Sequence, residues 1–200
     1  MTTRLKQLIN FVREIEKLQR IKREIYYPDK SQENDAEHSW HVAMIVMTLA
    51  NEFDPKADKL KMLKMALIHD LVEIYAGDTF LFDEEGQKTK EKRELDAAKK
   101  LFKILPEDIA KEFWELFEEF EALATAEAKI VKSIDHLQPL IHQMIHGGVT
   151  YKMHKLSPEK HDSMKRPKML HNENILTLYN DLYAEAKSKR IFYQGSTDKG

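Results

Sequence analysis

The stretch MLKMALIHDLVEIY, residues 62–75, decides the fold. Its polar side chains are Lys64, His69, Asp70 and Glu73, and nearly every other position is apolar around the helical wheel. A helix that is apolar on every side is a buried helix. His69, Asp70 and Glu73 nevertheless fall within an arc of roughly 100° on one side of it. Burying these groups unpaired would cost several kcal/mol each, and a divalent ion is a partner that an imidazole and a carboxylate can share. We therefore interpret this stretch as the floor of a metal site.

Length and charge limit the class of protein. The 200 residues fit one domain, and the 32 basic and 34 acidic residues leave a formal net charge of −2. This balance gives no bulk electrostatic reason to expect nucleic acid or an anionic membrane as a partner. There is no cysteine, and the longest nearly apolar run, residues 42–50, is far shorter than the roughly 18 residues of a membrane span. We expect a cytoplasmic protein.

Helical periodicity extends over most of the chain, and glycine and proline are few, at six each. These features predict an all-α protein with a single compact helical domain over residues 1–200. Asn34, with Glu37 three positions later, predicts a capping box that opens one helix. Thr125 is placed to cap another, and Gly77 to end the central helix. The helices expected from these signals cover residues 3–20, 34–53, 56–76, 87–104, 106–122, 125–146 and 172–188.

Three segments between these helices predict loops. Residues 20–33 contain Pro28 and read as a helix end followed by a loop. Residues 78–86 predict a loop with apolar side chains. Residues 147–169 are rich in Lys, His, Pro and Met without a clear period, so they predict a long loop or lid beside the core at 3–146. His154 and His161 in this segment are expected at the surface.

The sharpest local signal for chemistry is His69 followed by Asp70. Both can reach one ion only if it lies off the helix between them, so further ligands must come from neighbouring helices. His38 continues the buried stripe of its helix, and Asp135 is the acid in an otherwise apolar helix. Two imidazoles and two carboxylates suit Mn²⁺, Co²⁺, Fe²⁺, Ni²⁺, Zn²⁺ or Mg²⁺. Taken singly, each residue also has a plainer interpretation, as a hydrogen-bonded pair, a satisfied core histidine or a surface acid.

Three motifs together resemble a known family. They are EHSWHVAM (37–44), HDLVEIYAGD (69–78) and EAKIVKSIDHLQPL (127–140). They are similar to the HD-domain metal-dependent phosphohydrolases, and most of all to the small branch that contains the 5′-deoxynucleotidases. The resemblance implies that one divalent metal ion is held by His38, His69, Asp70 and Asp135.

The same resemblance implies roles for three further residues. It places Glu73 and Asp78 beside the attacking water and the substrate, and Arg23 at the phosphate. Relatives often carry an aromatic residue directly after this arginine, whereas Glu24 stands here, and Arg20 is a rival for the arginine's role. The expected reaction is hydrolysis of a deoxyribonucleoside 5′-monophosphate to the deoxynucleoside and phosphate.

Two alternatives stay open. The first is a phosphodiesterase or nucleoside polyphosphate hydrolase, because the cationic segment 149–168 would suit a more highly charged substrate. The second is a nucleotide-binding regulator in which the metal only stabilises the fold, although such a protein would need neither Glu73 nor Asp78. The expected partner is a nucleotide or another small phosphate ester. Because relatives are commonly dimers, a homodimer is a further expectation.

Overall fold

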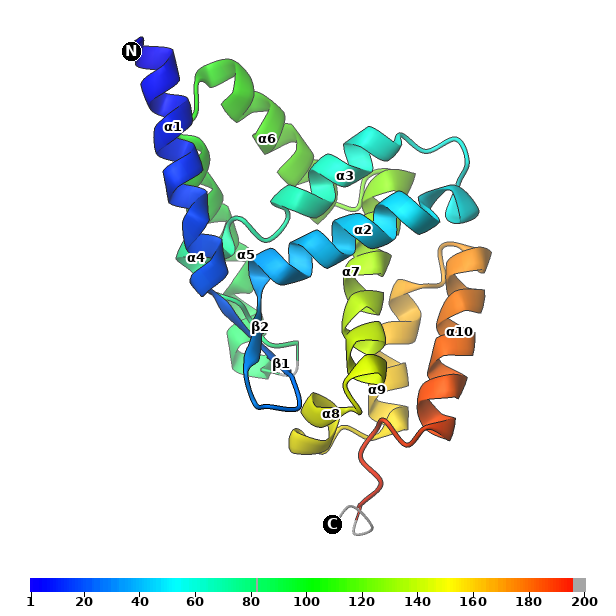
Figure 1. Cartoon of the computed structure of the whole chain (residues 1–200). Coiled ribbons are helices and arrows are strands. Elements are labelled where there is room, and N and C mark those ends of the chain that lie inside the picture. Colours follow the sequence, from blue (N-terminus) through cyan, green and yellow to red (C-terminus); the bar gives the residue numbers. More distant parts are fainter. Residues whose placement is uncertain (82, 196–200) are drawn as a thin grey trace.

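The computed structural model describes residues 1–81 and 83–195 of the chain. Within these residues helices dominate, and the β-structure is a small hairpin, so the predicted all-α class is confirmed (Figure 1). No helix among these residues is long and apolar enough to cross a membrane. The elements in chain order are α1 (Thr3–Ile15), the 3₁₀ helix η1 (Glu16–Arg20), β1 (Lys22–Tyr26), β2 (Gln32–Asn34), α2 (Asp35–Phe53), α3 (Lys59–Ile68), α4 (Glu73–Ala76), α5 (Glu84–Phe102), α6 (Glu107–Glu121), α7 (Ala126–Ile145), α8 (Val149–Met153), α9 (Pro158–Lys165), the 3₁₀ helix η2 (Arg166–Lys168) and α10 (Glu173–Ser188).

Helix α7 lies at the centre of the helical packing. It packs against α2, α3, α6, α8 and α10, and its N-terminus is capped by the Thr125 side chain, as predicted (Figure 1). Ile130, Ile134 and Leu137 follow one another at helical spacing and are completely or almost completely buried. They join Val42 of α2 and Met65 of α3 in one hydrophobic core. A polar side chain on this face of α7 is therefore held inside the molecule.

Helix α2 begins at the predicted capping box. The Asn34 side chain accepts hydrogen bonds from the backbone of Ala36 and Glu37, at 3.1 Å each, and the Glu37 carboxylate accepts from the Asn34 backbone at 3.0 Å. This cap fixes the first turn of α2, where Asp35 and His38 are both buried.

Residues 20–33 do not form the predicted loop. Strands β1 and β2 pair antiparallel, with Lys22 opposite Asn34 and Tyr26 opposite Gln32. Within β1 only Ile25 is buried, so the strand lacks the alternating apolar pattern by which a half-buried strand is recognised. The hairpin leads directly into α2 and carries Arg23 toward the interior of the molecule.

The predicted central helix over 56–76 is wrong in its second half. Helix α3 ends at Ile68, and α4 begins only at Glu73. Between them, the backbone N–H of Leu71 donates to Ile68 at 3.1 Å, and that of Glu73 donates to Asp70 at 2.9 Å. These bonds to the residue three positions back tighten the chain into turns. Gly77, at φ 75°, ends α4 as predicted.

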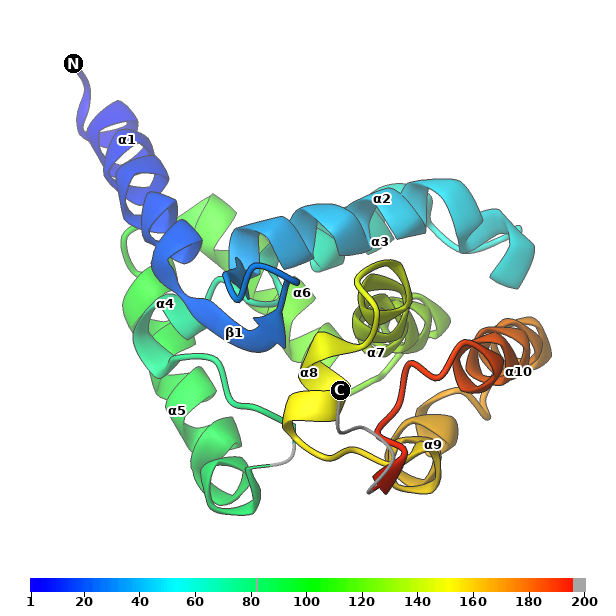
Figure 2. The same ribbon diagram turned by 60° about the horizontal axis from the view of Figure 1, so that its bottom comes forward.

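Residues 147–169 do not form the predicted long loop or lid. They fold into α8, α9 and η2, and α8 lies against β1 (Figure 2). The Ser157 side chain caps α9 by accepting from the Lys160 backbone at 3.2 Å, with Pro158 at the first helical position. These helices are too short to show a periodic pattern in the sequence.

The expectation that both histidines of this segment lie at the surface is half wrong. His154 is exposed, whereas His161 is 1% exposed. The ring of His161 stacks on Tyr179 and lies beside Tyr151 and Phe192. An imidazole here supplies packing area and a nitrogen for the Tyr151 hydroxyl at 3.3 Å. α9 is therefore anchored by an aromatic cluster rather than left mobile.

Candidate metal centre

The turn after α3 presents His69 and Asp70 to the same point. The Nδ1 atom of His69 donates to the Ala66 carbonyl at 3.0 Å, which leaves the lone pair on Nε2. That Nε2 atom lies 3.2 Å from Oδ1 of Asp70 and is buried, without a hydrogen-bond partner among the described residues. Because the chain turns here, adjacent side chains can converge instead of diverging by the angle of a regular helix.

His38 and Asp135 complete a four-residue cluster. His38 comes from the first turn of α2 and Asp135 from the middle of α7. The His38 Nε2 atom lies 3.1 Å from Asp135 Oδ1 and 3.7 Å from Asp70 Oδ2. Asp135 Oδ1 is also 3.8 Å from His69 Nε2. The structure thus brings together all four residues that the sequence suggested as ligands.

The tautomer of His38 is set by a buried amide. The Nδ1 atom of His38 is 2.9 Å from Oε1 of Gln138, and an amide oxygen only accepts, so Nδ1 carries the proton. The Gln138 orientation is fixed in turn because its Nε2 donates to Glu33 at 2.7 Å. Such a partner for the distal nitrogen is typical of a metal-binding histidine. In their neutral forms, His38 and His69 therefore both turn an unprotonated nitrogen toward carboxylate oxygens.

This donor set fits a divalent cation. A nitrogen lone pair facing a carboxylate oxygen is unfavourable unless a cation lies between them. The nearest ligand atoms of His38, His69 and Asp135 all lie within 4.8 Å of one another, close enough for a single ion. Burial opposes ionisation of Asp135, but its neighbours, with the charge of Lys132 foremost, hold its pKa well below the usual range. The carboxylate is therefore ionised and available as a ligand.

Arg23 connects this cluster to a second group of carboxylates. Its Nη1 atom lies 3.1 Å from Asp70 Oδ2, 3.3 Å from Asp35 Oδ1 and 4.0 Å from Asp78 Oδ1. Its Nε atom is 3.5 Å from Glu33 Oε2. The guanidinium is thus held by ion pairs at the edge of the candidate metal centre.

Glu73 and Asp78 lie in this second group. Oxygens of Asp35, Glu73 and Asp78 lie within 4.8 Å of one another. Burial, followed by the charges of Asp70, Asp35 and Asp78, raises the pKa of Glu73 well above its usual range. Burial also raises the pKa of Asp35 to about 7 and moves the pKa of Asp78 upward. Three crowded acids with raised pKa values can hold a proton and exchange it among themselves.

Sequence reasoning missed Asp35, Glu33 and Gln138. Asp35 stands one turn before His38, so helical spacing alone puts both on one face of α2. That spacing was the available signal. Glu33 and Gln138 contact each other although they lie about a hundred positions apart in the chain, and no local pattern in the sequence predicts this contact.

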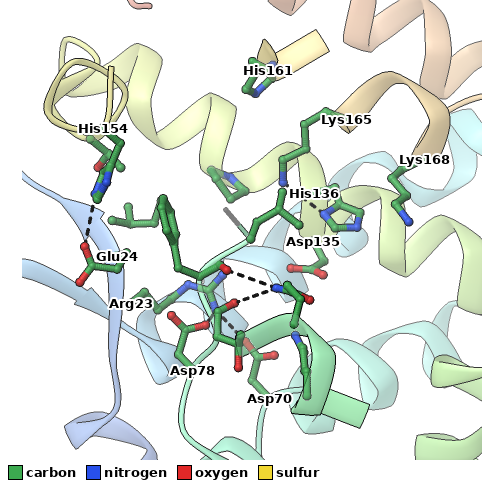
Figure 3. A pocket seen from close by; sticks show the side chains of 18 of the residues that line it. Arg23, Glu24, Asp70, Asp78, Asp135, His136, His154, His161, Lys165 and Lys168 are labelled. Carbon is green, nitrogen blue, oxygen red and sulfur yellow. Dashed lines mark hydrogen bonds and ion pairs between the residues drawn. The ribbon is translucent and has the colours of Figure 1, made fainter. Parts of the chain in front are cut away.

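A cavity of about 300 Å³ opens beside the candidate metal centre (Figure 3). One part of its wall carries Arg23, Asp70, Glu73, Asp78 and Asp135. The loop residues Thr79, Phe80 and Leu81 also line it, which accounts for the apolar side chains of the predicted loop 78–86; Phe82 lies outside the described residues. Another part of the wall is basic and is lined by Lys90, Lys132, His136, Lys165 and Lys168.

Known proteins are similar to this chain in sequence and fold. The model of the HD domain family matches residues 15–175. Human and bovine 5′-deoxynucleotidase HDDC2 are each 31% identical to the chain over 182 residues, which cover 90% of this chain and 86% of theirs. A crystal structure described as a predicted metal-dependent phosphohydrolase, from Magnetospirillum magnetotacticum, superposes with a TM-score of 0.86 at 39% identity and covers 96% of both chains. The chain therefore belongs to the HD-domain family.

Proposed function

We propose that this protein is a metal-dependent phosphohydrolase, and specifically a 5′-deoxynucleotidase that converts deoxyribonucleoside 5′-monophosphates to deoxynucleosides and phosphate. One observation carries the proposal: two imidazoles and two carboxylates converge beside a buried arginine at the wall of a ligand-sized cavity. The similarity to 5′-deoxynucleotidases over 90% of the chain supports the substrate class.

His38, His69, Asp70 and Asp135 would hold one divalent cation, which the donor set allows to be Mn²⁺, Co²⁺, Mg²⁺, Zn²⁺, Fe²⁺ or Ni²⁺. When bound, the ion supplies Lewis-acid chemistry toward a phosphate ester and acidifies water near it. The hydrogen bonds from Nδ1 of each histidine keep the other nitrogen free for this role. The protein's part in metal binding is thus to fix tautomers and to gather the donors before the ion arrives.

Arg23 would orient the phosphate. Its guanidinium is planar and carries several N–H donors, so it can keep its carboxylate contacts and still offer an N–H to a phosphate oxygen. Because its side chain is only 14% exposed, the arginine is held in place before the ligand binds. A fixed donor loses little conformational entropy on binding.

Glu73 and Asp78 would handle the protons. As water attacks phosphorus and the bond to the ester oxygen breaks, one proton must leave the water and one must reach the leaving oxygen. Glu73 is a stronger base than an ordinary carboxylate because burial and neighbouring charges raise its pKa. Asp78, whose pKa is also raised and whose Oδ1 lies 4.0 Å from Arg23 Nη1, would supply the proton that the leaving oxygen takes.

The test is a panel of substrates. Phosphate release is measured from deoxynucleoside 5′-monophosphates, ribonucleoside 5′-monophosphates and deoxynucleoside triphosphates, each with Mn²⁺, Co²⁺ or Mg²⁺. We expect the highest kcat/KM for the deoxynucleoside monophosphates. Faster turnover of triphosphates or diesters would replace the proposed reaction with another hydrolysis, and no turnover of any ester would favour a regulator. A homodimer and a cytoplasmic location stay predictions beside this proposal.

A further inference from the structure

The basic wall of the cavity includes a buried lysine, an exposed lysine and a histidine that the reaction above does not use. Lys165 of α9, His136 of α7 and Lys168 of η2 line this part of the pocket, and we call them the basic triad (Figure 3). Figure 3 shows Asp135 between them and the group of Arg23, Asp70 and Asp78. Two of the three residues come from the segment 149–168, whose folded form the sequence did not reveal.

No described residue is a counter-ion for Lys165. It is 6% exposed, and its Nζ atom donates to Nδ1 of His136 at 3.2 Å. Neither Lys165 nor Lys168 forms an ion pair within the part of the chain that the structure describes. Burial, followed in smaller part by the charges of Arg23, Lys132 and Lys168 against that of Asp135, lowers the pKa of Lys165 to about 8. The ammonium is therefore mostly charged at neutral pH, and a buried charge without a partner is costly.

The other cations of the pocket already have partners. Arg23 contacts Asp35 and Asp70, Lys132 lies 3.2 Å from Asp135, and Lys90 lies 3.3 Å from Glu94. Burial holds the pKa of His136 well below its usual range, so among the described residues of the pocket wall the unpaired positive charge lies on Lys165 and Lys168. In the proposed reaction, Arg23 and the metal ion would balance the charge of the reacting phosphate. The positive charge of the basic triad is therefore available for another anionic group.

The cavity volume shows that one molecule must serve both sides. At about 300 Å³ it is at the lower end of the range for small-molecule pockets, so a second independent ligand has little room. We propose that the basic triad binds a second anionic group of the substrate, so that the pocket accepts a phosphate ester that carries another phosphate. This inference rests on the proposed function, because the second phosphate is additional to the phosphate that the proposed reaction hydrolyses.

The experiment compares ligands with one and two phosphates. Calorimetry measures the binding of deoxyadenosine 5′-monophosphate, 3′,5′-bisphosphate and 5′-diphosphate to Mn²⁺-loaded Glu73→Gln protein, in which turnover is suppressed. We expect at least one doubly phosphorylated ligand to bind roughly tenfold or more tightly than the monophosphate, since a charge-assisted contact to a buried ammonium is gained. The tighter of the two shows where the second phosphate lies.

Variants then assign the preference to the triad. Lys165→Met, which nearly preserves the side chain's shape, should reduce the affinity ratio of the doubly to the singly phosphorylated ligand by about tenfold. Lys168→Met should reduce it less, because this side chain is exposed. It also supplies the test if Lys165→Met does not fold. Lys155→Met, an exposed lysine outside the pocket in the same segment, is the matched control and should leave the ratio unchanged.

Two results would overturn the inference. One is equal binding of all three ligands to the parent protein, and the other is an equal loss for all three in Lys165→Met. The second result would mean that Lys165 serves the reacting phosphate. Failure of the proposed function is distinguished separately, because wild-type protein would then release phosphate from no ester whatever the calorimetry shows.

Discussion

Asp70 is shared between the two halves of the site. Its Oδ1 atom lies 3.2 Å from His69 Nε2 and its Oδ2 atom 3.1 Å from Arg23 Nη1. Asp70→Asn keeps the shape but replaces one oxygen by a donor, so we expect the bound metal to fall from one equivalent per chain to below about a tenth. Elemental analysis after gel filtration measures this, with Asp96→Asn on exposed α5 as the control. Full metal content in Asp70→Asn would remove this residue from the ligand set.

Glu73 tests the chemistry separately from metal binding. Glu73→Gln removes the proton acceptor but adds no bulk, so kcat should fall about 10²–10⁴-fold while the metal content stays at one equivalent. The matched control is Glu91→Gln, an exposed glutamate of α5. Normal turnover in a metal-loaded Glu73→Gln protein would contradict the proposed role.

His161 makes the stability of the fold depend on pH. Burial lowers its pKa to about 3, whereas an unfolded chain has a histidine pKa of about 6.5. Below pH 6.5 this histidine is protonated in the unfolded state but stays neutral in the folded state. Its contribution to stability is therefore lost as pH falls from 6.5 toward 3.

The consequence is measurable in metal-free protein. Between pH 7 and pH 5 we expect the wild type to lose about 2 kcal/mol of unfolding free energy more than His161→Phe loses. Urea unfolding at the two pH values gives both numbers. His154→Gln, at an exposed position of the same segment, should lose as much as the wild type. Equal losses for wild type and His161→Phe would show that this imidazole is not the sensitive group.

At the scale of single residues, the sequence identified polar residues that stand in otherwise apolar helices. His38 and Asp135 stood out for that reason, and the structure puts them 3.1 Å apart. Asp35 was hidden because an acid just inside a helix N-terminus is ordinarily explained by the helix dipole. Lys165 was hidden because its burial depends on tertiary packing against His136, 29 positions away.

The junction of α7 and α8 provides a prediction at the scale of an element. Gly147 and Gly148 both have positive φ, 72° and 74°. A Cβ atom at Gly147 would meet nothing, whereas one at Gly148 would fall on the carbonyl oxygen of Ile191, well inside van der Waals contact. Gly147→Ala should lower the free energy of unfolding by about 1 kcal/mol, because alanine disfavours the left-handed backbone. Gly148→Ala should lower it by a further 1–3 kcal/mol or about that, because its methyl group would also overlap Ile191. Thermal and urea unfolding of the pair measure the difference, and equal costs would contradict the close packing of the C-terminal segment here.

Elements were predictable where they were long. Residues 3–20 are helical throughout, as α1 followed by η1, and α2, α7 and α10 lie close to their predicted ranges. The short elements were missed: β1, β2, α8 and α9 bury too few residues to leave a periodic pattern. The break between α3 and α4 was missed because apolar residues continue through it, with Leu71 and Val72 both buried. Tertiary packing, rather than local preference, decides these places.

Across the whole molecule, the proposed ligands join segments that are distant along the chain. They come from α2, the turn after α3, and α7, which pack against one another in the core. An ion bound only in the folded state stabilises it, by about 2.7 kcal/mol at a hundredfold excess over Kd. For a chain of this length, this corresponds to roughly 5–10 °C in Tm. Calorimetry with Mn²⁺ and with excess chelator measures the shift, and an unchanged Tm would show that the cluster binds no ion.

One chain of contacts runs from Arg23 through Glu33 and Gln138 to His38, with separations of 3.5, 2.7 and 2.9 Å. In the proposed reaction, Arg23 at one end would bind the phosphate and His38 at the other end would bind the metal ion. Linkage between two binding sites is reciprocal. If the bound nucleotide raises the affinity for the metal ion by some factor, the bound ion must raise the affinity for the nucleotide by the same factor. Without the metal ion such a protein would bind the nucleotide weakly, and without the nucleotide it would bind the ion weakly. It would therefore respond to the concentrations of both.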